Sequence, residues 1–555
     1  MERPEEVRKV LNSVQERVVG FVEQADRASA ESGHNDESQP KILDLKKPEE
    51  LKAVFEQNLT SSGQGHDGLV RIVDNLLKYS VNTWQQGFLD KLYSSPNAPG
   101  LAAELLLGTL NANVHVYQSA PALTVIEKLI TRRFAELFGL TGPNAGGISV
   151  QGGSASNTTA IVVARNTLFP ETKKNGAGDH RFVLFTSAHG HYSIEKAAQM
   201  IGLGSNAVWS VPVDPEGRMI PHKLDEEIQK AKDAGKTPLF VNATAGTTVL
   251  GTFDPFTEIA EICRKHNTWF HIDGAWGGAF IFSNRQKHKL EGSHLADSIA
   301  INPHKMLGVP LTCSFLLGAD MTKFHSSNTL PAGYLFHNDV SEGSEVWDLG
   351  DLTLQCGRRG DALKMFLNWN YIGSAGYEER IDSASDVAVH LCNIIAESPD
   401  LILLSKNPPP CFQICFFYAP FKQMVYHTDK LIDGRKPDEA ERGKLNGEIT
   451  ELIADGLIQR GFMVDYAPPA AAQVEGDGKY LRCVVNLHTK KETVELLVAV
   501  VLELGAKAVR KQRGLELNST FVNPNQAPAP GQRPKNPLEM GRGPQGQPNA
   551  SDFVL

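Results

Sequence analysis

The chain has 555 residues, a formal net charge of -9, 41% hydrophobic residues and 21% charged residues. A chain of this length is too long for one compact core, so we expect two or three domains in one subunit. The acidic balance argues against a nucleic-acid binder, and no run rich in lysine and arginine opposes that interpretation.

The sequence shows no targeting or membrane signal. Its first residues, MERPEEVRKVLNSVQERVVGFVEQ, are charged and amphipathic. No stretch reaches the roughly 18 apolar residues that a membrane span needs. We therefore expect a cytoplasmic protein with no membrane partner. The seven cysteines lack the spacing of metal ligands, which favours reduced thiols, and we predict no metal site.

Residues 1–119 are predicted to form an N-terminal helical segment. An amphipathic helix is expected over residues 1–30, and the polar residues 31–40 are expected to form a link. From residue 65 to residue 120 the pattern is again helical.

Residues 120–375 alternate short β-rich runs with helical stretches, which predicts a large α/β domain with a mostly parallel sheet covered on both faces. Residues 376–513 mix helices with strands such as CFQICFFYAP and YLRCVVNL and predict a small α+β domain. Residues 514–555 are rich in Pro, Gly, Asn and Gln and predict a disordered tail. The clearest strands are expected at 182–187, 238–244, 269–275 and 298–302.

A lysine follows one of these strands in the segment Asn302-Pro303-His304-Lys305. Lysine forms a Schiff base with an aldehyde cofactor when it is desolvated or lies near another cation. His304 can contact a phosphate and lower the proton affinity of the lysine. A lone lysine after a strand is usually a solvated surface residue, but this context favours a function.

An aspartate, Asp273, ends the hydrophobic run WFHIDGA, at the edge where parallel sheets bind ligands. A carboxylate there can keep a pyridine nitrogen protonated, so that the ring accepts the electrons left by a departing CO2. The alternative is a cap for the following turn. The small residues on either side favour the cofactor role, because they let a flat ring approach the backbone.

Three weaker motifs follow other strands. The Gly/Ser-rich turn SVQGGSASNT, residues 149–158, opens a helix and can bind an anion, or can serve as a plain helix cap. His189 or His191 can stack on an aromatic ring, although a structural histidine is the more usual case. A threonine of the segment 244–248 can offer a hydroxyl near a ring. Together the five motifs predict a pyridoxal 5′-phosphate (PLP) site of the aspartate-aminotransferase-like type, fold type I.

The chain resembles the group II PLP-dependent amino-acid decarboxylases, and most of all their glutamate, cysteine-sulfinate and aspartate decarboxylase branch. The motifs VNATAGTT, HIDGAWGG, NPHKMLGV, AGYLF and LQCGR carry the resemblance, which covers about residues 70–505. It implies an α-decarboxylase, a carboxy-lyase, that acts on a small acidic L-amino acid and works as a homodimer with shared active sites.

The resemblance also implies roles for single residues. Lys305 would form the Schiff base, Asp273 would pair with the pyridine nitrogen, and His191 would stack on the ring. Tyr334 would protonate the carbanion in the neighbouring subunit's site, and Arg482 would pair with a substrate carboxylate. The implied cofactor-binding residues are Ala155, Ser156, His191, Thr248, Asp273, Ala275, Asn302, His304 and Lys305.

The segment Leu89-Asp90-Lys91-Leu92 departs from the family's Phe-Asn-Gln-Leu, which faces the distal acid of the substrate. A lysine in place of the amide can pair with a shorter acid, which favours aspartate, giving β-alanine, over glutamate, giving GABA, or cysteine sulfinate, giving hypotaurine. The alternative is that Lys91 points to solvent and pairs with Asp90 or Glu104.

Other functions stay open at this point. The same fold supports other PLP reactions, such as oxidative deamination or aldehyde formation, but these often accompany a change at the loop tyrosine, and Tyr334 is retained. A catalytically dead scaffold is the other class, and intact Lys305, Asp273 and His191 argue against it. An aromatic substrate would leave Arg482 without a partner acid.

Overall fold

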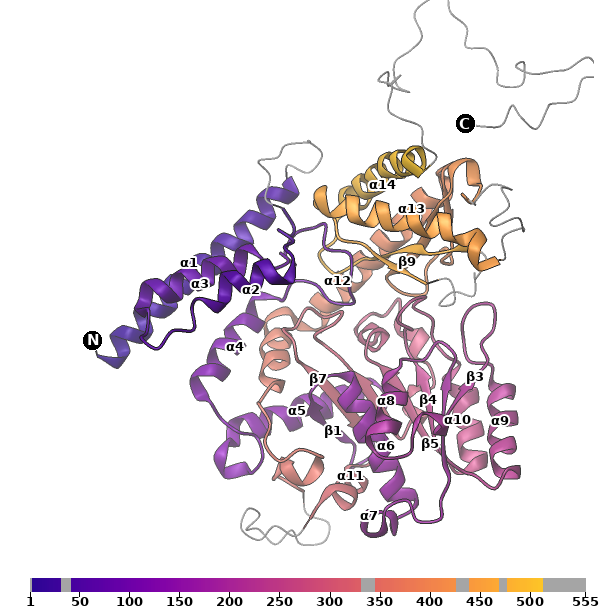
Figure 1. Ribbon diagram of the computed structural model, residues 1–555. Coiled ribbons are helices and arrows are strands. Elements are labelled where there is room, and N and C mark those ends of the chain that lie inside the picture. The colour runs from indigo at the N-terminus through magenta and orange to yellow at the C-terminus, as the bar shows by residue number, and fades with distance from the viewer. Residues whose placement is uncertain (1, 31–40, 331–344, 426–438, 469–476, 513–555) are drawn as a thin grey trace, which may run out of the picture. The chain divides into compact units, whose positions relative to one another are not determined.

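A seven-stranded sheet contains the strands that carry the predicted motifs. The computed structural model describes residues 2–30, 41–330, 345–425, 439–468 and 477–512. The strands of this sheet lie in the order β1-β7-β6-β5-β4-β2-β3 (Figure 1). Their bounds are β1 Gly146–Val150, β2 Phe182–Ser187, β3 Val208–Val211, β4 Thr237–Thr244, β5 Trp269–Gly274, β6 Ser298–Ile301 and β7 Ser314–Gly318.

The sheet is mostly parallel. Strands β3, β2, β4, β5 and β6 pair in parallel, whereas β7 pairs antiparallel with both β6 and β1. Because β7 reverses direction between them, β1 points the same way as β6. The predicted α/β class is confirmed, and the four predicted strands are present within a residue or two of their expected bounds.

Helices cover both faces of the sheet because both faces are apolar. Along β2, Val183 and Phe185 belong to one hydrophobic core, and Phe182 and Leu184 belong to the other. This alternation follows from the two-residue period of a strand. The helices of the first core are α5 Pro121–Leu137, α9 Pro221–Asp233, α10 Phe256–His266 and α12 Ala362–Glu397. Those of the second core are α6 Gly153–Leu168, α8 Ser193–Met200 and α11 Met321–Asn328, and the short α7 Thr172–Asn175 follows α6.

A smaller antiparallel sheet follows α12 in the chain. Its strands lie in the order β10-β11-β9-β8. They are β8 Leu401–Leu403, β9 Gln413–Tyr418, β10 Asp465–Ala467 and β11 Tyr480–Val484. The helices in this part of the sequence are α13 Glu439–Gln459 and α14 Lys491–Gln512. Strands β9 and β11 were expected, whereas the three-residue β8 and β10 were not.

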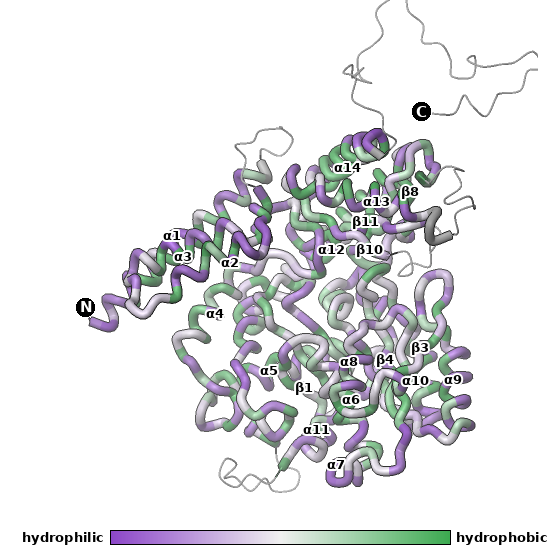
Figure 2. Tube along the Cα trace, in the orientation of Figure 1, coloured by the Kyte–Doolittle hydropathy of each residue, from purple (hydrophilic) through white to green (hydrophobic). Residues whose placement is uncertain are grey.

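The N-terminal segment is helical over only part of its predicted length. Helices α1 Arg3–Ala30, α2 Pro48–Glu56, α3 Gly65–Lys78 and α4 Ala98–Leu110 are present. Figure 2 shows hydrophilic and hydrophobic residues alternating along α1 and α3, which confirms the amphipathic helix. The helical pattern expected from residue 65 to residue 120 is wrong for residues 79–97 and 111–116, which form turns, bends and irregular backbone.

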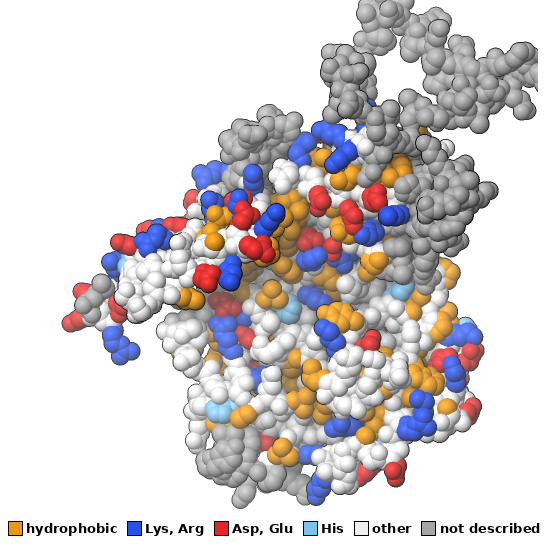
Figure 3. All heavy atoms as spheres, viewed as in Figure 1, with side chains coloured by type: hydrophobic (Ala, Val, Ile, Leu, Met, Phe, Trp, Pro, Cys, Tyr) orange, Lys and Arg blue, Asp and Glu red, His pale blue; other side chains and the backbone are white. Residues whose placement is uncertain are grey.

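Charged side chains of both signs are interspersed on the described surface, as the face in Figure 3 illustrates. Among the described residues, no helix is both long and apolar enough to cross a membrane.

Candidate active site

Five loops meet at one edge of the seven-stranded sheet. They follow β1, β2, β4, β5 and β6, which all point the same way, so their carboxyl ends share that edge. The loops after β1, β2, β4 and β6 contain the Gly/Ser turn, the two histidines, Thr248 and Lys305, respectively, and Asp273 lies at the end of β5 itself. The topology thus explains how motifs far apart in the sequence come together.

Lys305 lies in the turn after β6, where its backbone N–H donates to Asn302 O at 3.0 Å. Burial lowers the pKa of the Lys305 ammonium below that of an ordinary lysine, and the Asp273 carboxylate opposes this shift only in part. No hydrogen bond or ion pair of Nζ is found within the described part of the chain. A desolvated lysine without a fixed partner has the properties that a Schiff-base amine requires.

Asp273 is buried at the end of β5, where both carboxylate oxygens accept hydrogen bonds. Oδ2 accepts from Asn157 Nδ2 at 3.0 Å, and Oδ1 accepts from the backbone N–H of Ala275 at 3.1 Å. Burial alone would raise the pKa of the carboxyl, but the Lys305 ammonium and the amide of Asn157 outweigh it, so the pKa lies below its ordinary value. Asp273 is therefore a fixed negative charge in a site with little water.

Asn157 connects Asp273 to a chain of buried polar groups, here called the Asn157 network. Because Nδ2 donates to Asp273, Oδ1 accepts from His271 Nε2–H at 3.0 Å. His271 Nδ1 then accepts from Ser298 Oγ–H at 2.8 Å, and Ser298 Oγ accepts from Trp269 Nε1–H at 2.8 Å. In each hydrogen bond of this network, only one of the two groups can be the donor.

The buried histidine of the network is neutral. Burial lowers the pKa of His271 to about 4, although the carboxylate of Asp273 favours the charged form. Asn157 Nδ2 also donates to Ser193 Oγ at 2.9 Å, and the Ser193 backbone N–H donates to His191 Nδ1 at 3.2 Å. The orientation of Asp273 is thus coupled by hydrogen bonds to that of His191.

The Gly/Ser turn after β1 faces the loops of β5 and β6. A Cβ placed on Gly153 would lie 3.0 Å from the Asn302 amide and 3.3 Å from the Ala275 side chain. In the orientation that satisfies both amide atoms, Asn302 Oδ1 accepts from the Gly153 N–H and Nδ2 donates to Ser314 Oγ. Gly152 has a φ of +92° with open space beyond it, and α6 begins at Gly153. A helix that begins in an open glycine turn is suited to an anion.

The remaining cofactor candidates lie around this turn. Ala155 and Ser156 are in the first turn of α6, and the Ser156 backbone N–H donates to Gly152 O at 3.1 Å. His304 lies 2.9 Å from Cys313 O through Nδ1, and burial lowers its pKa to about 4, so it is held as a neutral ring.

Of the two histidines after β2, His191 and not His189 faces Asp273. The pKa of His191 is lowered, first by burial, and the charges of Asp273 and Lys305 both act on it. His189 instead packs against the turn at Gly217, where an added Cβ would lie 2.9 Å from its Nδ1. The ring-stacking role that the resemblance implies for His191 stays a prediction.

Arg482 and Lys91 lie together, but around an acid of the chain itself. Arg482 Nη2 donates to Asp465 Oδ2 at 2.6 Å, and Lys91 Nζ donates to the same oxygen at 2.9 Å. Lys91 also lies 3.2 Å from Asp90 Oδ1. Of the two partners expected for a solvent-facing Lys91, Asp90 is present, whereas Glu104 pairs with Lys364 and Arg359.

Two further predicted site residues, Thr248 and Tyr334, remain to be placed. Thr248 lies in the loop after β4, and its carbonyl accepts from Arg482 Nη1 at 3.1 Å. Gln413 Nε2 donates to the neighbouring Thr247 O at 2.9 Å, and its Oε1 accepts from Trp276 Nε1 at 3.0 Å. These bonds join the small sheet to the edge where the five loops meet. The predicted proton donor Tyr334 lies outside the described residues.

Three residues of the site, His271, Asn157 and Asp465, were missed by the sequence reasoning. His271 and Asp273 are two apart on one strand and so share a face, a signal that the sequence contains but that was not used. Asn157 stands in the motif that was identified, yet only its helical position shows that it reaches Asp273. Asp465 left no signal, because its pairing with Arg482 depends on strand register.

These residues fit PLP. An anion fits the open glycine turn before α6, an aldehyde fits the buried Lys305, and a cationic ring nitrogen fits the hydrogen-bonded carboxylate of Asp273. When bound, the cofactor would be held by these groups and by the neutral His191.

Comparisons with known proteins support the conclusion that the chain binds PLP. Residues 48–419 match the family described as "Pyridoxal-dependent decarboxylase conserved domain". An L-aspartate decarboxylase of Metarhizium robertsii is 48% identical over 520 residues, which cover 92% of this chain and 98% of that protein. An acidic amino acid decarboxylase of Xenopus tropicalis is 38% identical and covers 77% of this chain and 81% of its own.

Among solved structures, that of mouse CSAD superposes with a TM-score of 0.79 at 31% identity, covering 91% of this chain and 99% of that one. The fold is therefore fold type I, and the chain is a carboxy-lyase that uses PLP to decarboxylate an amino acid. By the extent of these matches and by its site, the chain belongs to the group II pyridoxal-dependent decarboxylases.

Proposed function

We propose that the enzyme removes the α-carboxylate of L-aspartate, which yields β-alanine and CO2. The observation that carries this proposal is that Lys91 and Arg482 converge on one carboxylate oxygen, Asp465 Oδ2. Two cations this close favour a substrate with an acid at this end. A lysine also reaches further than an amide, which suits the shorter of the two common acids. The relative named L-aspartate decarboxylase supports the same choice.

The chain's own residues would act as follows. PLP, when bound, supplies the electron sink for decarboxylation. Lys305 Nζ would hold the cofactor until the substrate's amine replaces it, Asp273 would keep a proton on the ring nitrogen, and His191 would cover the ring. Arg482 binds a substrate carboxylate and thereby orients the bond that breaks. Tyr334 returns a proton to Cα.

Product analysis tests the substrate. The purified, PLP-loaded enzyme is offered aspartate, glutamate, cysteine sulfinate and DOPA in separate reactions, and the amine formed is identified by chromatography. We expect β-alanine to be the dominant product. GABA or hypotaurine as the dominant product would overturn the choice of aspartate, and the absence of any amine would overturn the proposal as a whole.

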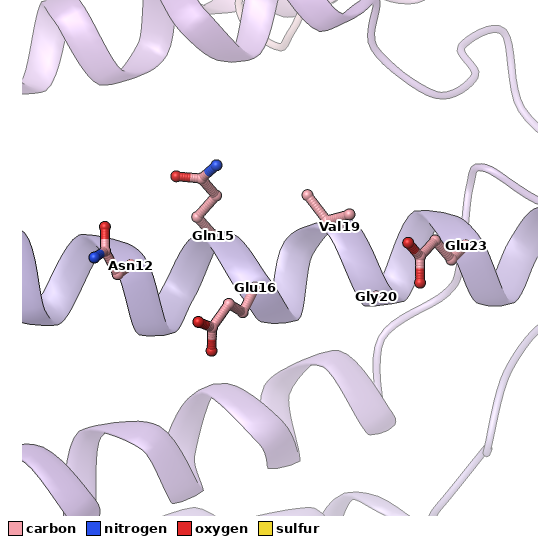
Figure 4. A pocket seen from close by; sticks show the side chains of 6 residues that line it. All are labelled: Asn12, Gln15, Glu16, Val19, Gly20 and Glu23. Atoms are coloured by element: carbon pink, nitrogen blue, oxygen red, sulfur yellow. The ribbon is translucent and has the colours of Figure 1, made fainter.

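We infer that the enzyme is a homodimer with shared active sites. The face of α1 exposes Val7, Leu11 and Val19, and Val19 lines a shallow pocket formed along this one helix (Figure 4). Exposed apolar side chains on a helix favour a protein partner, and a second copy is the simplest one. Sedimentation of the holoenzyme is expected to give twice the mass of the chain, and a monomer would contradict the inference.

Subunit mixing tests whether Tyr334 acts across the interface. Lys305→Ala and Tyr334→Phe variants are each expected to be nearly inactive. If each site takes Lys305 from one subunit and Tyr334 from the other, heterodimers contain one intact site, and an equilibrated mixture recovers roughly a quarter of the parent activity. No recovery, with subunit exchange verified by mass, would show that both residues act within one subunit.

We also propose a cytoplasmic location, because the seven cysteines are free thiols and not disulfides. Fractionation of source cells is expected to place the activity with cytoplasmic markers, and recovery with an organelle would contradict it.

A further inference from the structure

The four charged residues Asp90, Lys91, Asp465 and Arg482 form a cluster, here called the acid–base cluster, which the proposed function uses only in part. Asp465 is its centre, because its Oδ2 accepts from both Arg482 and Lys91. Its two carboxylates and two cations balance in charge. Arg482 is 6% exposed, and its Nε is buried without a hydrogen-bond partner among the described residues.

Backbone contacts set the position of each charged group. In the antiparallel pair of β10 and β11, Asp465 lies directly opposite Arg482, so their side chains share a face. The segment that carries Lys91 is bonded to the same sheet. Met463 N donates to Gly87 O at 2.8 Å, Leu89 N donates to Met463 O at 3.0 Å, and Val484 N donates to Leu89 O at 2.8 Å. The acid–base cluster is therefore a built site and not a chance meeting of surface chains.

The cluster adjoins the active-site edge through Arg482. The bond from Arg482 Nη1 to Thr248 O reaches the loop after β4, on the same edge as Asp273 and Lys305. A substrate acid that pairs with Arg482 must therefore share it with Asp465. Because Arg482 Nε has no partner among the described residues, it remains as a further donor for the substrate's carboxylate.

From this geometry we propose that Asp465 determines which length of acid the enzyme accepts. Its carboxylate forms the far wall of the acid pocket and ties Lys91 to Arg482. A four-carbon acid ends short of this wall, whereas a five-carbon acid would have to place its carboxylate where Asp465 already lies. Like charge and occupied space both oppose the longer acid. This proposal rests on the proposed function, because it assumes that Arg482 faces the substrate.

Two variants separate charge from volume. Asp465→Asn keeps the volume and removes the charge, and Asp465→Ala removes both. One methylene in a pocket changes discrimination by about tenfold to two-hundredfold. We expect Asp465→Ala to lower the ratio of kcat/KM for aspartate to that for glutamate by about tenfold or more. Asp465→Asn is expected to lie between the parent and Asp465→Ala. Glu451→Gln is the matched control, since it removes a carboxylate that pairs with Lys479 and contacts neither Arg482 nor Lys91, and it should leave the ratio within about twofold.

A binding measurement provides a readout other than turnover. Succinate and glutarate, the two diacids without the amine, are titrated calorimetrically into the holoenzyme. The parent is expected to prefer succinate, and Asp465→Ala is expected to lose that preference. The absorbance of bound PLP and the unfolding midpoint verify that each variant is folded, and Asp465→Asn tests the proposal if Asp465→Ala fails to fold.

The outcomes distinguish the two proposals. A parent enzyme that does not prefer aspartate overturns the proposed function. A parent that prefers aspartate, together with folded Asp465 variants that keep the parent's kcat/KM ratio and diacid preference, overturns the role of Asp465 alone.

Discussion

Replacing Asn157 with leucine would break the Asn157 network at its centre while keeping a similar side-chain volume. The variant removes the donor to Asp273 Oδ2 and the acceptor of His271 Nε2–H. A hydrogen bond to a charged group contributes about 1.5–3 kcal/mol. At about 1.4 kcal/mol per pKa unit, its loss raises the pKa of Asp273 by about one to two units.

The raised pKa of Asp273 makes cofactor binding weaker at low pH. Below its pKa Asp273 is protonated and no longer pairs with a cationic ring nitrogen, so the variant loses PLP affinity as the pH falls. PLP dissociation constants of variant and parent are measured between about pH 8 and about pH 5. We expect their ratio, variant over parent, to rise by at most about twofold to eightfold across this range, because the pKa of Asp273 starts below its ordinary value.

The control is a variant of the other residue that accepts a hydrogen bond from the Asn157 amide. Ser193→Ala removes the other acceptor of Asn157 Nδ2 and leaves the bond to Asp273 in place. For Ser193→Ala, the ratio of the PLP dissociation constants of variant and parent should not vary with pH. If Asn157→Leu gives the same flat ratio, with an unfolding transition that shows a folded protein, the coupling of Asn157 to Asp273 is refuted.

Three further predictions concern stability and substrate choice. Glu127→Ala leaves Arg358 buried without its partner, so urea unfolding should show a loss of about 3–5 kcal/mol. The double variant Glu127→Leu/Arg358→Met should recover part of that loss, and no recovery would contradict the assigned cause. Lys91→Gln should lower the preference for aspartate over glutamate, and an unchanged kcat/KM ratio would exclude Lys91 from substrate choice. His271 and His304, each with a pKa of about 4, stay neutral in the folded chain while the unfolded chain takes up protons below about pH 6.5. For each histidine, the free energy of unfolding should therefore fall by about 3 kcal/mol as the pH is lowered from about 6.5 to about 4. His271→Gln should make the free energy of unfolding depend less steeply on pH.

Local patterns were enough to predict the sheet and the cofactor end of the site. Continuous apolar runs predicted β2, β4, β5 and β6, and strand ends in a parallel sheet share one edge. That rule predicted, from the sequence alone, that Asp273 and Lys305 lie close together. The same rule could not predict the antiparallel strand β7, because the direction of a strand depends on its partners and not on its composition.

The acid end of the site was less predictable, because its geometry depends on long-range register. Lys91 and Arg482 were both identified as candidates, but nothing near either of them in the sequence indicates that Asp465 lies between them. The pairing needs β10, a three-residue edge strand, and three backbone bonds to the segment that holds Lys91. Short edge strands have little apolar pattern of their own, so sequence periodicity does not reveal them.

The bonds from Gln413 and Arg482 to the loop after β4 have a consequence for how such enzymes diverge. The residues proposed to hold the cofactor come from the large sheet, whereas the residues proposed to meet the substrate's acid come from the small sheet and the segment beside it. Inherited changes in the small sheet can therefore alter the preferred amino acid without disturbing the chemistry. New substrate preferences then arise by reshaping one wall while the catalytic machinery is passed on intact.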